Sequence, residues 1–299
     1  MTARALIKQM TRYRWGYAFV TPWVLLYLAF GIYPLFLSFY LTFFNYNFIN
    51  PADQAFVGLG NWVAGLGDPL FWHSMFNILY NQAIFIGLTL VIGLGIALLL
   101  QAITHFGRLF RTVYFVPTVV SIVVVMLIGN YLVAPGGPLQ GYLLQLGLIG
   151  KPIFWKSELW LSMPVLALIN TWKWFGIETV ILLAGLLAID PQLHEAAAID
   201  GANAWQRFWK ITLPMLNPQI FFILVMNGIN GLQMFVEVYM NFDLYGGIYN
   251  QALTPVLYVY AQAFDKSNMG YASTLGLILA VIIALLTAVQ FRYAQRDVE

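Results

Sequence analysis

Long apolar runs alternate with short polar stretches along almost the whole chain. A helix that crosses a bilayer needs about 20 consecutive apolar residues. Six runs are long enough, and one of them holds a lysine and a glutamate near its centre. The pattern therefore predicts an all-α polytopic membrane protein with six transmembrane helices, at about residues 15–44, 78–100, 113–134, 160–189, 219–241 and 271–292.

The composition agrees with this pattern and excludes several classes of protein. Of the 299 residues, 61% are hydrophobic and 9% are charged, and the mean hydropathy is +0.77. Soluble domains carry about 25% charged residues, so a soluble enzyme is excluded. The chain has no cysteine, which excludes disulfides, thiolate metal sites and cysteine nucleophiles. A net charge of +2 gives no reason to expect a nucleic-acid partner.

The distribution of lysine and arginine predicts the orientation, because these residues concentrate in cytoplasmic loops. Three lysines lie on the other side of the predicted spans and one lies within the fourth. The remaining ten of the fourteen lie on one side: Arg4, Lys8, Arg12, Arg14, Arg108, Arg111, Arg207, Lys210, Arg292 and Arg296. We therefore expect both termini in the cytoplasm, with a cytoplasmic tail at 1–14, one transmembrane domain at 15–294 and a cytoplasmic loop at 190–215.

The loop at 190–215 is the most polar long stretch of the chain. Asp190 and the following proline are typical of a helix start. Gly201 interrupts that helix, and Asn203 followed by Gln206 marks a second start. Three consecutive alanines, 196–198, give this stretch small side chains, which would let another protein approach it closely. The loop is therefore expected to form two short helices, which serve either as an amphipathic connector in the membrane interface or as a docking site for a partner.

The motif EAAAIDGANAWQRFWKITLPMLNP, residues 195–218, resembles the EAA loop of permeases from ABC importers. The stretches FVGLGNW, GRLFRTVYFVP, LLAGLLAIDPQLHEAA and MGYASTLGLIL are similar to the carbohydrate-importer branch, and YPLFLSFYLTFFNYN to its maltose-type first permease. The residues that match the loop motif are Glu195, Ala196, Ala197, Asp200, Gly201, Ala202, Ile211, Leu213 and Pro214.

This resemblance implies a type I importer permease that carries a sugar, or a related glycoside or polyol, across the cytoplasmic membrane of a prokaryote. The implied partners are a second permease in a heterodimer, two cytoplasmic ATPases, an extracytoplasmic sugar-binding protein and membrane lipid. The loop at 190–215 would be the coupling helix that contacts an ATPase. The chain would be no enzyme and would bind no cofactor, since it lacks a G-x-x-x-x-G-K-[ST] loop and leaves ATP and Mg to the ATPase.

No catalytic residue and no metal site is expected. His194 and Glu195 begin an H-E-x-x-H motif, but position 198 is alanine. A membrane-embedded enzyme, or a channel without an ATPase partner, is the alternative function. Glu178 and Glu237 are the carboxylates such an enzyme could use, but no nucleophile or metal ligand accompanies them in the sequence.

Two polar stripes in the predicted spans are candidates for a substrate path, because ionisable residues at membrane depth usually serve function. Amide side chains suit sugars, since they supply both donors and acceptors. The alternative is that these residues form hydrogen bonds between helices. The fifth span carries Asn227, Asn230, Glu237 and Asn241 at helical spacing, with Gln233 beside them. The fourth carries Asn170, Trp174 and Glu178, with Lys173 turned away from Glu178.

Overall fold

The computed structural model describes residues 13–102 and 107–294, which are almost entirely helical. The predicted tail residues Arg4, Lys8 and Arg12, and Arg296 at the other end, lie outside the described residues. The chain packs as two compact units. The first unit comprises residues up to Gly67 together with Gln262–Ile278, and the second comprises Asp68–Ala261 with the residues from Leu279 onward.

Five described helices are long and apolar enough to cross a membrane, and a sixth candidate consists of two helices with a 59° bend between them. The bent pair is Ala204–Met215 with Asn217–Gly231. The structure is thus an all-helical membrane protein with five to six candidate spans. The five stretches are Trp15–Leu41, Pro69–Ala102, Ile122–Gln145, Ser162–Ala188 and Met269–Arg292, and the third is interrupted at residues 134–137.

The first unit begins with a helical run whose apolar window has no buried residues. A small antiparallel hairpin follows, in which Phe44 pairs with Phe56. The amide of Asn61 secures the turn by donating to the Thr42 and Phe44 carbonyls at 2.9 and 3.0 Å. The elements are α2 (Arg14–Tyr27), η1 (Leu28–Ile32), α3 (Tyr33–Leu41), β1 (Phe44–Asn45), η2 (Pro51–Asp53), β2 (Ala55–Phe56), α4 (Gly60–Leu66) and, except for its first residue, η5 (Ala261–Asp265).

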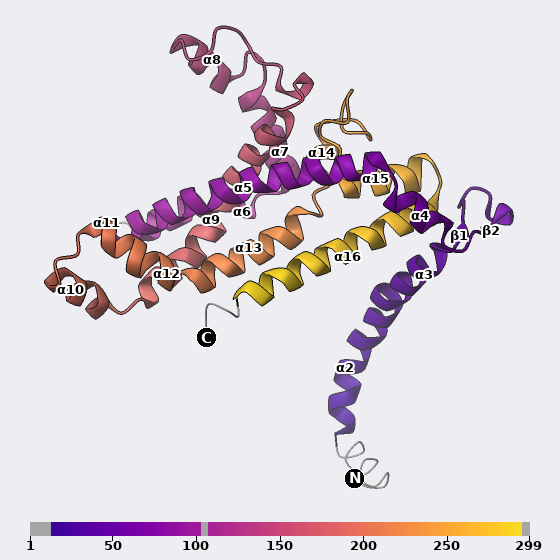
Figure 1. Cartoon of the computed structure of the whole chain (residues 1–299), viewed down its shortest axis with the longest axis horizontal. Helices are drawn as coiled ribbons and strands as arrows, with labels where there is room; N and C mark the ends of the chain where they lie inside the picture. The colour runs from indigo at the N-terminus through magenta and orange to yellow at the C-terminus, as the bar shows by residue number, and fades with distance from the viewer. Residues whose placement is uncertain (1–12, 103–106, 295–299) are drawn as a thin grey trace. The chain divides into compact units, whose positions relative to one another are not determined.

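The second unit holds most of the helices (Figure 1). Helix α16 (Met269–Ala294) contributes its first part to the first unit and the rest to this one. The elements are α5 (Pro69–Ala102), α6 (Gly107–Val119), α7 (Ile122–Val133), α8 (Pro138–Gln145), η3 (Trp155–Ser157), α9 (Ser162–Ala188), α10 (Pro191–Ile199), α11 (Ala204–Arg207), η4 (Phe208–Thr212), α12 (Leu213–Met215), α13 (Asn217–Gly231), α14 (Val236–Tyr239) and α15 (Pro255–Tyr260).

Helix α9 is the centre of the second unit. In its apolar window 56% of the residues are buried, against 28% in α5 and α16. It packs along α5 and also contacts α6, α7 and α13. Two of its glycines make this close packing possible, because an added Cβ would lie 2.6 Å from the Tyr114 carbonyl at Gly176 and 2.7 Å from Gln219 at Gly185. Leu182 and Leu186 lie in the hydrophobic core that α9 shares with α5, α6 and α13.

The predicted third span, 113–134, is not one helix. Helix α6 ends at Val119 and α7 starts at Ile122, which leaves carbonyl oxygens before the break without helical partners. Lys173 of α9 donates to two of them, to Thr118 O at 3.1 Å and to Val120 O at 2.6 Å. Such groups need partners inside the protein at membrane depth. The sequence analysis missed this break because Lys173 is distant in sequence.

The predicted fifth span, 219–241, is also interrupted. Helix α13 ends at Gly231, and the short helix α14 begins only at Val236. Gly228 and Gly231 weaken the helix, because glycine is about 1 kcal/mol less favourable than alanine in a helix interior. A residue distant in sequence fixes the turn between α13 and α14, since the Thr254 hydroxyl donates to the Met234 carbonyl at 2.9 Å. The predicted stripe from 227 to 241 therefore does not lie on one continuous helix.

We expect Lys173→Met to destabilise the second unit. The substitution leaves the Thr118 and Val120 carbonyls without their charged donor, which lowers the free energy of unfolding by about 3 kcal/mol. Denaturation of the purified protein in detergent measures this. Lys151→Met, at an exposed lysine, is the control. Equal stability of the two variants would show that Lys173 does not hold the break.

Candidate functional site

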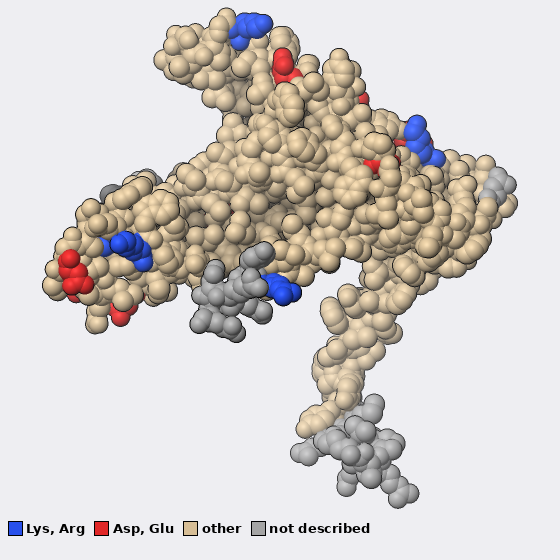
Figure 2. Space-filling model, viewed as in Figure 1, with Lys and Arg blue, Asp and Glu red and all other residues tan. Residues whose placement is uncertain are grey.

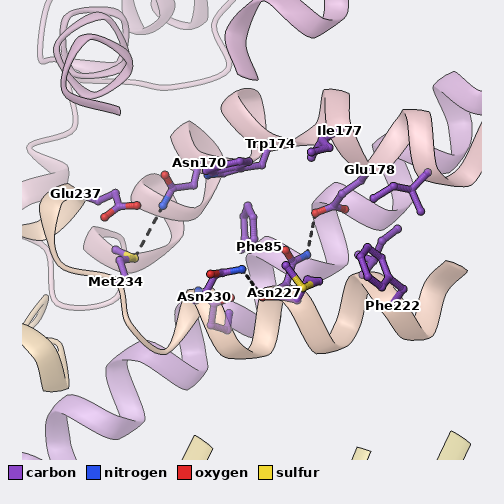
Figure 3. Close-up of a pocket in the computed structure, with 15 residues that line it drawn as sticks. Phe85, Asn170, Trp174, Ile177, Glu178, Phe222, Asn227, Asn230, Met234 and Glu237 are labelled. Carbon is purple, nitrogen blue, oxygen red and sulfur yellow. Dashed lines mark hydrogen bonds between the residues drawn. The ribbon is translucent and has the colours of Figure 1, made fainter. Parts of the chain in front are cut away.

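A cavity of about 370 Å³ opens within the second unit, between α5, α9, α13 and α14. Its size falls within the range of ligand pockets, roughly 300–1,000 Å³. Phe85, Ile177 and Phe222 give it apolar and aromatic walls. Six of the predicted path residues also line it, as Figure 3 shows: Asn170, Trp174, Glu178, Asn227, Asn230 and Glu237.

The polar side chains of the cavity bridge its walls. The Asn227 amide on α13 donates to the Glu178 carboxylate on α9 at 2.8 Å (Figure 3). The Asn170 amide points to the Met234 sulfur at 3.9 Å, which is a weak contact. Glu178 is 3% exposed and Asn170 is 5% exposed. The turn that interrupts the fifth span thus lines the cavity. Irregular backbone at membrane depth is tolerated where it is buried in protein or lines such a cavity.

Three predicted path residues do not line the cavity. Lys173 is directed to the carbonyls of α6 and its break. Gln233 is exposed, and its amide donates to the Ile229 carbonyl at 2.8 Å. Asn241 is buried, and its amide donates to the Glu237 carbonyl at 2.7 Å. All three side chains thus donate to backbone carbonyls.

The sequence analysis missed Gln82, which lines the cavity from α5 and is 7% exposed. It lies against Gly231, where an added Cβ would meet the Gln82 side chain. Glycine at the end of α13 therefore allows this amide to approach. Two adjacent amides, Asn81 and Gln82, within the predicted second span were the signal available in the sequence.

The loop at 190–215 forms the two short helices that its capping residues predict. Asp190 caps α10 by accepting from the Gln192 amide at 2.9 Å. At the other end, Ala202 N donates to Ala197 O at 2.9 Å and Gly201 N to Ala198 O at 3.1 Å. These two bonds form a Schellman motif, which requires a left-handed residue. Gly201 supplies it with a φ of +82°.

The second half of the loop begins with a complete capping box. Asn203 accepts from the Gln206 backbone, and the Gln206 side chain accepts from the Asn203 backbone, both at 2.9 Å. Helix α11 then continues through the π-helical turn η4 to Met215. The Arg207 guanidinium donates to the His194 carbonyl at 3.4 Å and so joins the two halves. The loop is a rigid, capped unit.

The surface of this loop is open. Every residue of α10 is exposed or half-buried, and an added Cβ at Gly201 would meet no atom within 4 Å. Ile199 is 87% exposed and Trp205 is 69% exposed. Acidic and basic residues also appear at the end of the molecule that carries α10 and α11 (Figure 2). The other predicted loop residues lie as follows: Glu195, Ala196, Asp200 and Pro214 are exposed, and Ala197, Ala202, Ile211 and Leu213 are half-buried.

The loop connects the two helices that face each other across the cavity. Helix α9 ends at Ala188, directly before α10, and α13 begins at Asn217, directly after α12. The Glu178–Asn227 hydrogen bond joins the same two helices at the cavity. The loop is therefore joined directly to both cavity walls.

Comparison with known proteins identifies the family. The model of the family "Binding-protein-dependent transport system inner membrane component" matches residues 90–297. The chain belongs to this family. The sequence-based prediction of a permease from an ABC importer is thereby confirmed, as is the prediction that the chain is a transport subunit and no enzyme. The family also makes it a multi-pass protein of the inner membrane.

Several curated relatives match over almost their whole length. The lactose transport system permease protein LacF of Rhizobium radiobacter is 34% identical over 288 residues, with 94% of each chain covered. The arabinooligosaccharides transport system permease protein AraP of Bacillus subtilis is 31% identical, with 92% of this chain and 87% of AraP covered. The sn-glycerol-3-phosphate transport system permease protein UgpA of Brucella abortus is 30% identical, with 94% of this chain and 95% of UgpA covered.

A solved structure shares the fold. One chain of a bacterial ABC transporter that imports the acidic polysaccharide alginate superposes with a TM-score of 0.81. The match covers 98% of this chain and 99% of that chain, at 23% identity. This similarity establishes the fold alone.

We expect Asn203→Ala to loosen the second half of the loop. The substitution removes one arm of the capping box, and loss of such an N-cap costs about 0.5–2 kcal/mol. Hydrogen exchange at the Gln206 amide, which loses its acceptor, is therefore expected to accelerate by about tenfold. The matched control is Gln192→Ala, because the backbone amide of Gln192, and not its side chain, makes the cap of α10. Unchanged exchange in Asn203→Ala would contradict the rigid-unit description.

Proposed function

We propose that this chain is one of two paired permeases in an ATP-driven importer of a sugar, or of a related glycoside or polyol. Its partners are a second permease, two cytoplasmic ATPases and an extracytoplasmic sugar-binding protein. The observation that carries the proposal is the connection of the exposed loop to α9 and α13, the two helices that line the cavity. The names of LacF and AraP support a sugar as the substrate.

The cavity provides the groups that a sugar requires. Amides at Asn170, Asn227 and Asn230 offer hydrogen-bonding groups to hydroxyls. Trp174 and Phe85 add flat apolar surfaces for the C–H faces of a sugar ring. The interrupted fifth span fits this role, because transporters commonly place substrate sites at discontinuous helices.

The loop acts as the contact for an ATPase. An interfacial amphipathic helix is usually rich in lysine and arginine on its polar face. Helix α10 has neither, and its exposed charges are the acidic Glu195 and the adjacent Asp200. Small alanines and the protruding Ile199 present a compact surface to a soluble protein. These features favour docking over membrane attachment.

The loop and both termini lie in the cytoplasm in this proposal. Ten of the fourteen lysine and arginine residues belong to that side of the predicted spans. The loop then faces the compartment in which ATP and Mg are available to the partner ATPases. This chain supplies the path and the mechanical contact.

We expect Gly201→Asp to abolish sugar uptake. Aspartate tolerates the left-handed backbone better than most residues and meets no atom of the chain, so the helices still insert. The added carboxylate nevertheless projects from the surface that contacts the ATPase. Both uptake and the stimulation of ATP hydrolysis by loaded binding protein are measured in the reconstituted complex.

Gly150→Asp is the matched control, because Gly150 is exposed and an added Cβ there also meets no atom. It is expected to retain uptake and stimulation. Normal uptake and stimulation in Gly201→Asp would refute the coupling role of the loop.

We expect Asn230→Leu to slow uptake by up to about tenfold at subsaturating sugar, since one hydrogen bond contributes about 0.5–1.5 kcal/mol. Asn230 lines the cavity, whereas the nearby Gln233 does not. Gln233→Leu is therefore the control, and both variants should co-purify with their partners. If Asn230→Leu fails to assemble, the residue is structural and this part of the path is wrong.

A further inference from the structure

Three buried acceptor atoms at the cavity have no hydrogen-bond partner in the described part of the chain. They are Gln82 Oε1, Asn170 Oδ1 and Glu178 Oε2. Their side chains are 7%, 5% and 3% exposed, and each lines the cavity. The Thr89 hydroxyl of α5 lies within hydrogen-bonding reach of Glu178, but it donates its single proton to the Phe85 carbonyl at 2.9 Å.

The amide nitrogens of the cavity, in contrast, already donate within the protein. Asn227 donates to the Glu178 carboxylate, and Asn230 donates to the Met226 carbonyl. A backbone carbonyl can only accept, and so can an ionised carboxylate. Gln82 donates to the Asn81 side chain at 3.3 Å, and Asn170 points to the Met234 sulfur. Each of these amide nitrogens keeps a second N–H but already has one partner, whereas the three oxygens have none, and a buried acceptor is costly until a donor reaches it.

The charged side chains that line the cavity are acceptors as well. Glu178 and Glu237 both line it. Lys173 is the cation that acts on Glu237, but it does not line the cavity, and its ammonium donates to two backbone carbonyls. With all three ionised, the cavity region carries one net negative charge. A protonated Glu178 would add one donor and bring this net charge to zero, and it would leave the Gln82 and Asn170 acceptors unchanged.

We propose that Glu178, Glu237 and the free amide oxygens make the cavity selective for uncharged polyhydroxyl ligands and exclude sugars that carry a carboxylate or phosphate. This inference rests on the proposed function, in which the cavity takes a sugar. Hydroxyls donate to the free acceptors. An anionic group brings further acceptors and a like charge into a region of low dielectric constant.

Alkylation of a single thiol reports whether the cavity is occupied. The chain has no cysteine, and Met226 lines the cavity and is 42% exposed, so Met226→Cys places one reactive thiol in the wall. The whole reconstituted complex is treated with a maleimide, and labelling of this chain is read by mass spectrometry. The probes are methyl galactoside and methyl glucoside, each paired with its uronide, which differs only in the carboxylate.

The neutral glycosides are expected to slow alkylation, and the uronides to need concentrations at least about tenfold higher for the same protection. In Glu178→Gln and in Glu237→Gln this difference is expected to shrink to about threefold or less. Glu158→Gln removes an equal charge from an exposed site outside the cavity and is expected to keep the full difference.

Each contrary result has a distinct meaning. Equal protection by glycoside and uronide in the parent protein would overturn the charge selection and leave the sugar path intact. An unchanged difference in both glutamine variants would overturn the role of the two carboxylates. If none of the four probes protects, the inference also fails. Uptake of the same neutral glycosides into vesicles, measured separately, then decides whether the proposed function fails with it.

Discussion

The structure depends on the requirement that polar groups at membrane depth find partners inside the protein. Lys173 shows this most clearly. Its ammonium satisfies two carbonyls where the third span breaks, and the Thr118 hydroxyl donates back to the Lys173 carbonyl at 3.1 Å. Helix α9, which carries Lys173, is also the most buried of the candidate spans. A lysine in the middle of an apolar helix is therefore a structural element, and it allows α6 and α7 to remain separate helices.

The second interruption is the one that forms the cavity. Because α13 ends at Gly231, the turn toward α14 can close over the space between α5 and α9. The loop at 190–215 then links the end of α9 to the start of α13, and the Glu178–Asn227 hydrogen bond links the same two helices at the cavity. In the proposed function, the docking surface and the substrate path therefore lie at two ends of the same pair of helices. In that proposal, this connection gives the ATPase a direct mechanical route to the cavity.

Sequence reasoning worked where local rules decide the structure. Length and hydropathy predicted a helical membrane protein, and the caps at Asp190 and Asn203 predicted the two helices of the loop, because capping depends on residues only two or three positions apart. It was wrong about the continuity of the third and fifth spans. It also missed Gln82 as a cavity residue. Those features depend on Lys173, Gly231 and α9, which meet their partners only after the chain has folded.

The central claim is that the loop moves the two cavity walls. The direct test is the distance between spin labels at Ile177→Cys on α9 and Met226→Cys on α13, both at the cavity, in the complete reconstituted complex. Pulsed electron paramagnetic resonance can follow this distance without nucleotide, with bound ATP and after hydrolysis. The account predicts that the distance distribution changes when the ATPases bind ATP and returns after hydrolysis. A distribution that stays the same through the cycle, in a complex that transports sugar, would contradict it.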